Sequence, residues 1–150
     1  MTDSTLPGRA VSPVPGDHLV AIDRRECVRL LQTARGFGRI GATVHGRAVI
    51  YPVNFIVHRD TVLFRTRTGG ELAEATNNVV VAFEVDQKEA LYHEGWSVLV
   101  TGLATHVTEP TEIGQLSHLA LTPWAGEARD CYVRIALDEI SGRRISHGVR

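Results

Sequence analysis

From Phe37 onward, apolar and polar residues alternate with a period of two through a series of short segments that end in turn-forming residues. Residues 37–44 and 47–57 flank His45-Gly46, which suits a two-residue hairpin turn. Further segments with strand character lie at 61–66, 79–85, 96–107, 131–137 and 140–145. A doubly wound sheet needs a helix between successive strands, and this pattern offers too few. The sequence therefore predicts a mainly β fold with short helices, built as a six- to seven-stranded antiparallel barrel.

Three segments have helical spacing instead. Asp23 suits the N-cap of a first helix of about three turns, with Glu26 folding back onto the cap and Gly36 stopping the helix. We expect two further short helices, at 72–76 and at 109–121, where Pro110 suits the first turn. None of these helices connects parallel strands, so they do not change the predicted fold class.

Length, charge and cysteine content limit what the chain does. Residues 1–17 contain three prolines and two glycines without periodicity, which predicts a flexible leader before one domain over 18–150. Sixteen basic and seventeen acidic side chains nearly balance, so we expect no nucleic-acid partner. No apolar stretch approaches the ~20 residues that cross a bilayer, so we expect no membrane partner. The two cysteines lack a Cys-x-x-Cys spacing and the N-terminus lacks a secretory pattern, which predicts a reduced, cytoplasmic protein.

The sequence offers no clear catalytic constellation. No serine lies in a Gly-x-Ser-x-Gly elbow, and Cys27 and Cys131 occupy positions typical of small core residues. The seven histidines form no His-x-x-x-His or His-x-His pair, so we predict no metal site. Four carboxylates gather near one strand end and suit either acid–base chemistry or a solvated loop: Glu84, Asp86, Glu89 and Glu94. We assign no catalytic residue.

The segment from Phe64 to Leu72 is the most informative for ligand binding. Arg65, Thr66, Arg67 and Thr68 alternate cationic and hydroxyl side chains at a strand end, and two glycines and a helix start follow them. Such side chains and the amides of a glycine turn suit a phosphate. A hairpin rim with solvated arginines has the same spacing, and the spacing alone favours neither interpretation.

A second unusual segment surrounds Pro52. Because proline cannot donate a ladder hydrogen bond, its strand needs a bulge or a free edge there. Asn54 is polar within an apolar strand and either bonds to backbone at a bulge or addresses a planar ligand. Trp96 and Trp124 either cover such a ligand or pack in the core or at an interface.

Several of these segments, taken in order, resemble a known family. They are Gly38–Gly41, Tyr51–Phe55, Val62–Thr66, Gly69–Leu72, Val81–Asp86, Trp96–Gly102, Thr122–Trp124 and Ile140–Arg144. Together they are similar to the flavin-binding split-barrel superfamily around pyridoxamine 5′-phosphate oxidase, and above all to its small actinobacterial and nitroimidazole-resistance-like members. The resemblance extends from about Asp23 to Ile145.

This resemblance implies a split β-barrel homodimer with FMN in clefts between the two subunits. It implies cofactor contacts from Val53 and Asn54 beside the isoalloxazine, Arg65, Thr66, Gly70 and Glu71 at the phosphate, Ser97 at the ring or ribityl chain, and Trp124 closing the cleft from the partner subunit. One residue departs from the family pattern, because Glu71 stands where relatives usually carry a lysine. A carboxylate there replaces an attraction for phosphate by a repulsion, which predicts weaker phosphate binding.

The activity implied by the resemblance is an oxidoreductase that uses FMN to transfer hydride or electrons to a small organic acceptor. Three alternatives remain open. The first is a reductase that uses the 8-hydroxy-5-deazaflavin coenzyme, as some relatives do. The second is a non-catalytic module that binds flavin or haem. The third is a dimer that has lost its cofactor through changes such as Gly70-Glu71.

Overall fold

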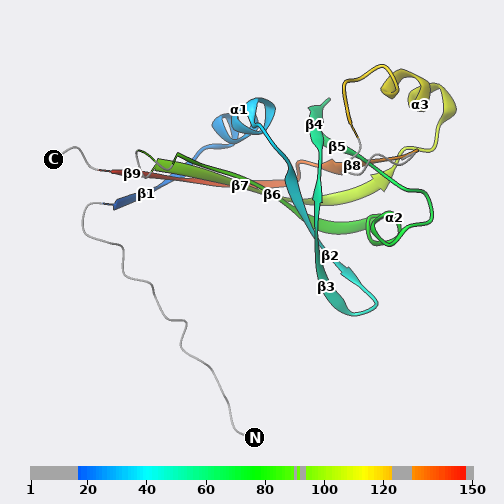
Figure 1. Cartoon of the computed structure of the whole chain (residues 1–150), viewed down its shortest axis with the longest axis horizontal. Helices are drawn as coiled ribbons and strands as arrows, with labels where there is room; N and C mark the ends of the chain where they lie inside the picture. The colour runs from blue at the N-terminus through cyan, green and yellow to red at the C-terminus, as the bar shows by residue number, and fades with distance from the viewer. Residues whose placement is uncertain (1–16, 90, 92–93, 123–129, 148–150) are drawn as a thin grey trace, which may run out of the picture.

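The computed structural model describes residues 17–89, 91, 94–122 and 130–147. In these residues, nine strands form one antiparallel sheet that carries three short helices (Figure 1). The strands are β1 (Asp17–Ile22), β2 (Gly38–Val44), β3 (Arg47–Val53), β4 (Phe55–His58), β5 (Thr61–Thr66), β6 (Val79–Glu89), β7 (Glu94–His106), β8 (Cys131–Ala136) and β9 (Glu139–His147). The helices are α1 (Arg24–Thr33), α2 (Glu71–Ala75) and α3 (Pro110–Leu116).

The sheet divides along β7. Neighbouring strands follow the order β3-β2-β6-β7-β8-β5-β4, and β9 pairs with both β7 and β1. One edge of β7 pairs with β6, whereas its other edge pairs with β9 over Gly95–Thr101 and with β8 over Ala104–His106. Figure 1 shows β1 and β9 extending from one end of the long β6–β7 hairpin, with α2 and α3 at the other. The predicted mainly β, antiparallel split barrel is therefore confirmed.

Inward-facing side chains of the curled sheet form one main core. Ile40, Phe64 and Phe83 come from three different strands, and none of the three is exposed to solvent. The ring of Phe55 meets that of Phe83 edge to face, with 4.9 Å between the centroids. Burial of each such side chain contributes about 2–3 kcal/mol, so this core fixes which face of each strand points inward.

Gly102 lies where the two halves of the sheet come closest. A Cβ on Gly102 would stand only 1.8 Å from the carbonyl oxygen of Ala136, an atom of the β8 backbone. Gly102 lies within the continuous strand β7, and its role is to let β8 approach. The change of partner along β7, from β9 to β8, therefore depends on the absence of a side chain at Gly102.

Turn chemistry agrees with the sequence at both tight hairpins. His45 and Gly46 both have positive φ, 47° and 74°, as a two-residue turn that matches strand twist requires. Arg59 and Asp60 do the same between β4 and β5, with φ of 48° and 57°. Pro52 lies in β3, which pairs with β2 and with no other described strand, so the predicted free edge is confirmed.

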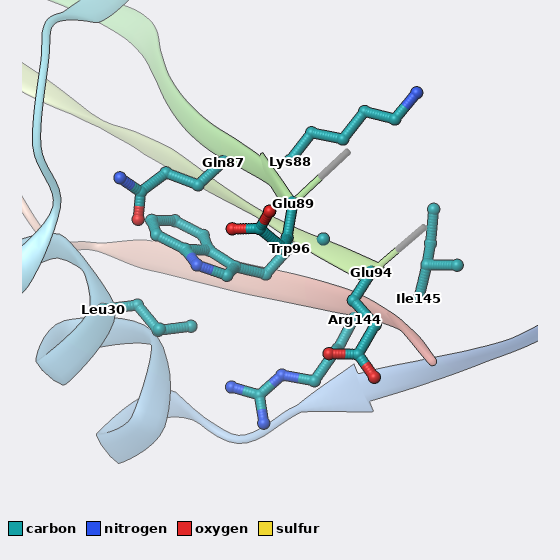
Figure 2. A pocket seen from close by; sticks show the side chains of 9 residues that line it. Leu30, Gln87, Lys88, Glu89, Glu94, Trp96, Arg144 and Ile145 are labelled. Atoms are coloured by element: carbon teal, nitrogen blue, oxygen red, sulfur yellow. The ribbon is translucent and has the colours of Figure 1, made fainter. Parts of the chain in front are cut away.

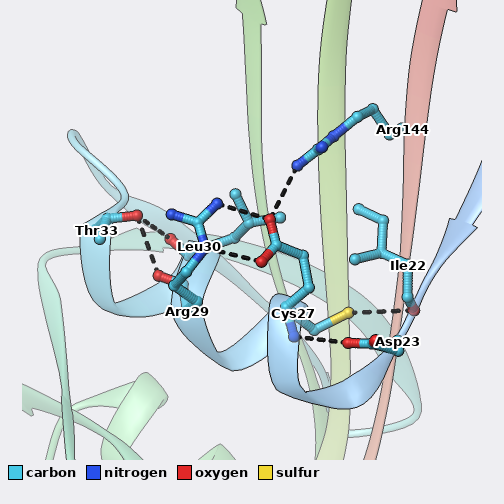
Figure 3. Close-up of polar contacts among 8 residues, drawn as sticks. Ile22, Asp23, Cys27, Arg29, Leu30, Thr33 and Arg144 are labelled. Atoms are coloured by element: carbon cyan, nitrogen blue, oxygen red, sulfur yellow. Dashed lines mark hydrogen bonds and ion pairs between the residues drawn. The ribbon is translucent and has the colours of Figure 1, made fainter.

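Helix α1 is tied to β9 by one carboxylate (Figure 3). Asp23 caps the helix by accepting a hydrogen bond from the amide of Glu26 at 2.8 Å, as predicted. The Glu26 carboxylate does not fold back onto the cap; it pairs instead with Arg29 at 2.6 Å and with Arg144 of β9 at 3.1 Å. These two guanidinium groups lower the pKa of Glu26 to about 2, Arg29 contributing most.

Three boundaries differ from the sequence prediction. Strand β1 was missed, because its described side chains from His18 to Ala21 are exposed on both faces and carry no burial period. The strand expected over 47–57 divides into β3 and β4 at Asn54. The helix expected over 109–121 ends at Leu116, because the chain beyond it turns toward β4 and β5.

Most of the predicted leader falls outside the described residues. None of the described helices is long and apolar enough to span a bilayer.

We expect the substitution Gly102→Ala to lower the free energy of unfolding by about 2–3 kcal/mol, because the β8 backbone must move to admit the new methyl group. The measurement is urea denaturation monitored by far-UV circular dichroism. Gly114→Ala is the matched control: no atom lies within 4 Å of a Cβ there, and alanine favours the α3 helix. Equal stability of the two variants would contradict the assigned role of Gly102.

Candidate functional site

A cavity of about 350 Å³ lies between the edge strand β3 and the end of β5. We call it the split cavity; its lining residues are Tyr51, Pro52, Val53, Arg65, Thr66, Arg67, Gly70, Glu71 and Leu72. The β3 side is apolar and the β5–α2 side carries the polar groups. A cavity with one apolar wall and several convergent donors is the usual form of a small-molecule site.

A tight turn shapes the polar wall. The amide of Gly70 donates to the carbonyl of Arg67 at 3.1 Å, which closes a four-residue turn. Gly69 holds φ of 75°, the left-handed region that its third position in such a turn favours. A Cβ on Gly70 would lie 3.2 Å from the Arg67 carbonyl oxygen and 3.7 Å from its Nε. The Arg67 side chain therefore folds back over the glycines, beside the cavity.

Arg65 is held on two sides. Its guanidinium lies 5.1 Å from the centroid of the Tyr132 ring, and its Nη1 donates to the carbonyl of Leu121 at 3.3 Å. Tyr132 stands opposite Arg65 in the β5–β8 register, so strand pairing brings the ring under the cation. Thr66, next along β5, is buried, with 2% of its surface exposed. Arg65 thus lines the cavity while its guanidinium is held against Tyr132 and Leu121.

Two side chains near the split cavity fasten the ends of the segment 123–129, which lies outside the described residues. The Asn54 amide donates to the carbonyl of Thr122 at 3.1 Å. The hydroxyl of Thr68 donates to Asp130 Oδ1 at 2.7 Å, and this bond contributes most to lowering the pKa of the Asp130 carboxyl. The strand ends around the cavity therefore also hold the connection from α3 to β8.

Helix α2 sets the position of Glu71. The ring Nε2 of His106, at the end of β7, lies 2.8 Å from the carbonyl oxygen of Ala73. The hydroxyl of Thr76 donates to the carbonyl of Leu72 at 2.7 Å, and Thr76 is fully buried. Glu71 itself is exposed at the start of the helix and forms no ion pair with any described residue.

Five of the eight predicted cofactor-binding residues line this cavity: Val53, Arg65, Thr66, Gly70 and Glu71. Asn54 lies next to the cavity, and its side-chain amide donates a hydrogen bond to the carbonyl of Thr122. Ser97 lies elsewhere, and Trp124 falls outside the described residues. The prediction that these residues bind a cofactor stays a prediction; the structure brings most of them to one cavity.

The site also contains residues that the sequence prediction did not include. Tyr51 and Leu72 line the cavity, and Tyr132, Asp130 and His106 hold its walls. The last three lie far from the others in sequence, and only the β5–β8 register and the packing of α2 bring them close. The only local signal was that Tyr51 directly precedes Pro52 in an edge strand.

A second, larger cavity of about 600 Å³ lies between α1 and the ends of β6, β7 and β9. Figure 2 shows the Trp96 side chain between Gln87 of β6 and Leu30 of α1, with Arg144 on the β9 side. Trp96 is half-buried and packs against the main core, and it also lines this cavity, so the alternatives of core packing, interface packing and ligand cover stay open. The charged residues around this cavity have mixed sign and do not converge on one point.

Away from the core, β3, β2, β6 and β7 present a surface that we call the outer face. Its exposed apolar side chains are Ile50, Val80, Leu99 and Leu103, with small residues at Gly41, Ala48 and Ala82 between them. Ile50 is 72% and Val80 62% exposed. At one margin of the outer face Ser97 lines a hollow of about 350 Å³ together with Arg143 and Leu19. At another margin Pro52 belongs both to the outer face and to the split cavity.

The remaining candidate groups have structural roles. Arg39 pairs with Asp86 at 2.8 Å and with Glu84 at 3.3 Å, whereas Glu89 stands opposite Glu94 in the β6–β7 register, so the four carboxylates form two pairs. Burial raises the pKa of both the Cys27 and Cys131 thiols, which makes them poor nucleophiles. Among the described residues, no group of three or more His, Cys, Asp or Glu side chains is placed to hold a metal ion.

Comparison with known proteins agrees with this geometry. The family model described as pyridoxamine 5′-phosphate oxidase matches residues 23–144. An uncharacterised protein of Mycobacterium tuberculosis is 37% identical over 142 residues, which cover 91% of this chain and 92% of that protein. The FAD binding protein of Mycobacterium smegmatis has a solved structure with a TM-score of 0.70 and 35% identity, covering 84% of this chain and 97% of that one. A FAD-binding protein of Mesorhizobium loti, 19% identical, shares the fold at a TM-score of 0.72 and covers 88% of this chain and 100% of that one.

We expect Thr68→Val to raise the pKa of Asp130 toward its ordinary value, because the hydroxyl that contributes most to stabilising the carboxylate is lost. With a lowered pKa, the contact with Asp130 is complete above the ordinary carboxyl pKa and weakens as pH falls through the folded value. The measurement is an NMR titration of the Asp130 carboxyl carbon. Thr43→Val, on an exposed part of β2, is the control and leaves this pKa unchanged. An unshifted Asp130 in Thr68→Val would exclude the contact.

Proposed function

The chain belongs to the pyridoxamine 5′-phosphate oxidase family, and from this membership we propose that it is a flavoprotein whose split cavity holds the phosphorylated tail of FMN or of a flavin that shares its ribityl phosphate. The observation that carries the proposal is that Arg65, Arg67 and Gly70, which closes the glycine turn, line the same cavity. The Mycobacterium smegmatis relative is a FAD binding protein, which supports a flavin as the ligand class.

The residues of the split cavity fit such a tail. Two guanidinium groups suit a phosphate, because charge-assisted hydrogen bonds to its oxygens are about twice as strong as neutral ones. The buried Thr66 lies between them on β5. Tyr51, Val53 and Leu72 provide apolar surface on the other sides. At about 350 Å³ the cavity lies at the small end of the ligand-site range, which suits the tail of a flavin better than the whole molecule.

When bound, the flavin would supply the hydride or electron transfer to a small organic acceptor. The work of this chain would be to bind the tail through Arg65 and Arg67, to place the ring along the free edge of β3, and to keep water from the apolar side at Val53. We assign no general acid or base in the split cavity. The reduced thiols support action in the cytoplasm.

We also propose that the protein is a homodimer that pairs through the outer face. A stable interface buries about 800 Å² on each partner and has an apolar centre. The outer face has such a centre in Ile50, Val80, Leu99 and Leu103, with small residues that allow close sheet contact. Because Pro52 belongs to both surfaces, a partner seated on the outer face would border the split cavity. Ser97, outside that cavity, would then act only across the interface.

The flavin proposal predicts that titration with FMN or FAD quenches flavin fluorescence and that Arg67→Met weakens both affinities about tenfold, the cost of one charge-assisted contact. Arg47→Met, an exposed arginine at the start of β3 outside the cavity, is the matched control. If the two variants bind flavin equally, the tail lies elsewhere. If the unaltered protein binds no flavin, the proposal is wrong. Turnover with a reduced nicotinamide and a quinone separates an enzyme from a storage or sensing module.

The dimer proposal predicts that Ile50→Lys shifts the protein from dimer to monomer, because a charge in the centre of a desolvated patch has no partner there. Light scattering coupled to size-exclusion chromatography measures the mass. Leu91→Lys changes a comparably exposed leucine at the β6–β7 turn, outside the outer face, and leaves the mass unchanged. A monomeric unaltered protein, or a dimeric Ile50→Lys variant, would rule out this interface.

A further inference from the structure

Three charged side chains line the split cavity, and one of them has the wrong sign for a phosphate. Arg65 and Arg67 are cationic, whereas Glu71 adds a carboxylate to the same lining. Arg65 already donates to the Leu121 carbonyl. Glu71 forms no ion pair among the described residues. Two guanidinium groups and one carboxylate give the lining the formal charge of a single cation.

We propose that Glu71 makes the split cavity select a flavin whose phosphate belongs to a diphosphate that continues into a ribose, as in FAD, over the terminal monoester of FMN. This inference rests on the proposed function, since it assumes that a flavin tail occupies the cavity. It refines the predicted cofactor from FMN to FAD and assigns Glu71 as the residue that sets the preference.

Charge is the first reason. A phosphate monoester carries about −1.5 to −2 at neutral pH, because its second pKa is near 6. Each phosphate of the FAD diphosphate has a single ionised oxygen, and only one of the two needs to enter the cavity. A lining with one net positive charge matches the single charge of one such phosphate. The second negative charge of FMN meets Glu71 without a cation to balance it.

Hydrogen bonding is the second reason. A carboxylate is acceptor-only and binds neighbouring ribose hydroxyls, as acidic residues do in dinucleotide sites. FAD continues beyond its phosphates into a ribose, and FMN ends there. Arg67 and Glu71 are exposed, whereas Thr66 deeper in the cavity is buried, so the tail has an open path past Glu71.

The fold holds Glu71 at this rim. It begins α2 directly after the Arg67–Gly70 turn, and the Gly70 carbonyl accepts the amide of Glu74 at 3.1 Å. His106 contacts the Ala73 carbonyl from β7 and fastens the helix to the sheet. Glu74, one turn further on, is equally exposed but does not line the cavity. The chain therefore offers a carboxylate on the same helix as an internal control.

The test compares the Kd of FAD, FMN and riboflavin, measured by fluorescence quenching, in the unaltered protein and in Glu71→Gln. We expect the unaltered protein to bind FAD more tightly than FMN. Glu71→Gln should tighten FMN about fivefold, the size of one exposed charge interaction, and should weaken FAD. Riboflavin, which has no phosphate, should bind both proteins equally. Glu74→Gln should leave all three affinities unchanged.

The outcomes separate this inference from the proposed function. If FMN and FAD bind, but their affinity ratio is the same in Glu71→Gln as in the unaltered protein, the role of Glu71 is wrong and the flavin proposal stands. If the unaltered protein binds FMN more tightly than FAD, the role of Glu71 is likewise wrong and the flavin proposal stands. A change in riboflavin affinity would show that Glu71 acts on the ribityl chain and not on the phosphate. If no flavin binds to any of these proteins, both proposals fail.

Discussion

The approach of β8 to β7 at Gly102 is the contact on which the rest of the molecule depends. A strand normally pairs with one neighbour along each edge, yet β7 exchanges β9 for β8 partway along the same edge. This exchange needs backbone where a side chain would stand, and Gly102 provides it. Because β8 carries β5 through a full register, the placement of Arg65 over Tyr132 follows from the same contact. The core packing of β7 thus determines where the cavity cations lie.

The polar wall of the split cavity shows how one chain segment serves both structure and binding. The side chains of Arg65 and Asn54 donate hydrogen bonds to the backbone carbonyls of Leu121 and Thr122, and the Thr68 hydroxyl donates to Asp130. These bonds hold the described ends of the connection between α3 and β8, and Arg67 takes part in none of them. Binding of an anion would therefore affect this connection through Arg65. A ligand that binds only the native arrangement would also stabilise it.

The sequence predicted the strands well because their signals are local. Alternation marks most of the strands, and His45-Gly46 marks a turn, so both can be recognised without knowledge of the fold. Strand β1 could not be recognised in this way, since its side chains from His18 to Ala21 are all exposed and give no period. For the site, the glycines and arginines were visible in one stretch. Tyr132, Asp130 and His106 were not, because only long-range register brings them to that stretch.

A single charge reversal in a family site has different meanings depending on its surroundings. If Glu71 faced a second cation, the pair would neutralise each other and the change would be close to silent. Here Glu71 forms no ion pair with a described residue, and the contact of His106 with α2 holds the backbone that carries the carboxylate at the rim. The cost of the charge therefore falls on the ligand. A ligand with one negative charge and a hydroxyl pair to offer turns that cost into recognition, which is why the departure from the family pattern is better understood as a change of specificity than as a loss of binding.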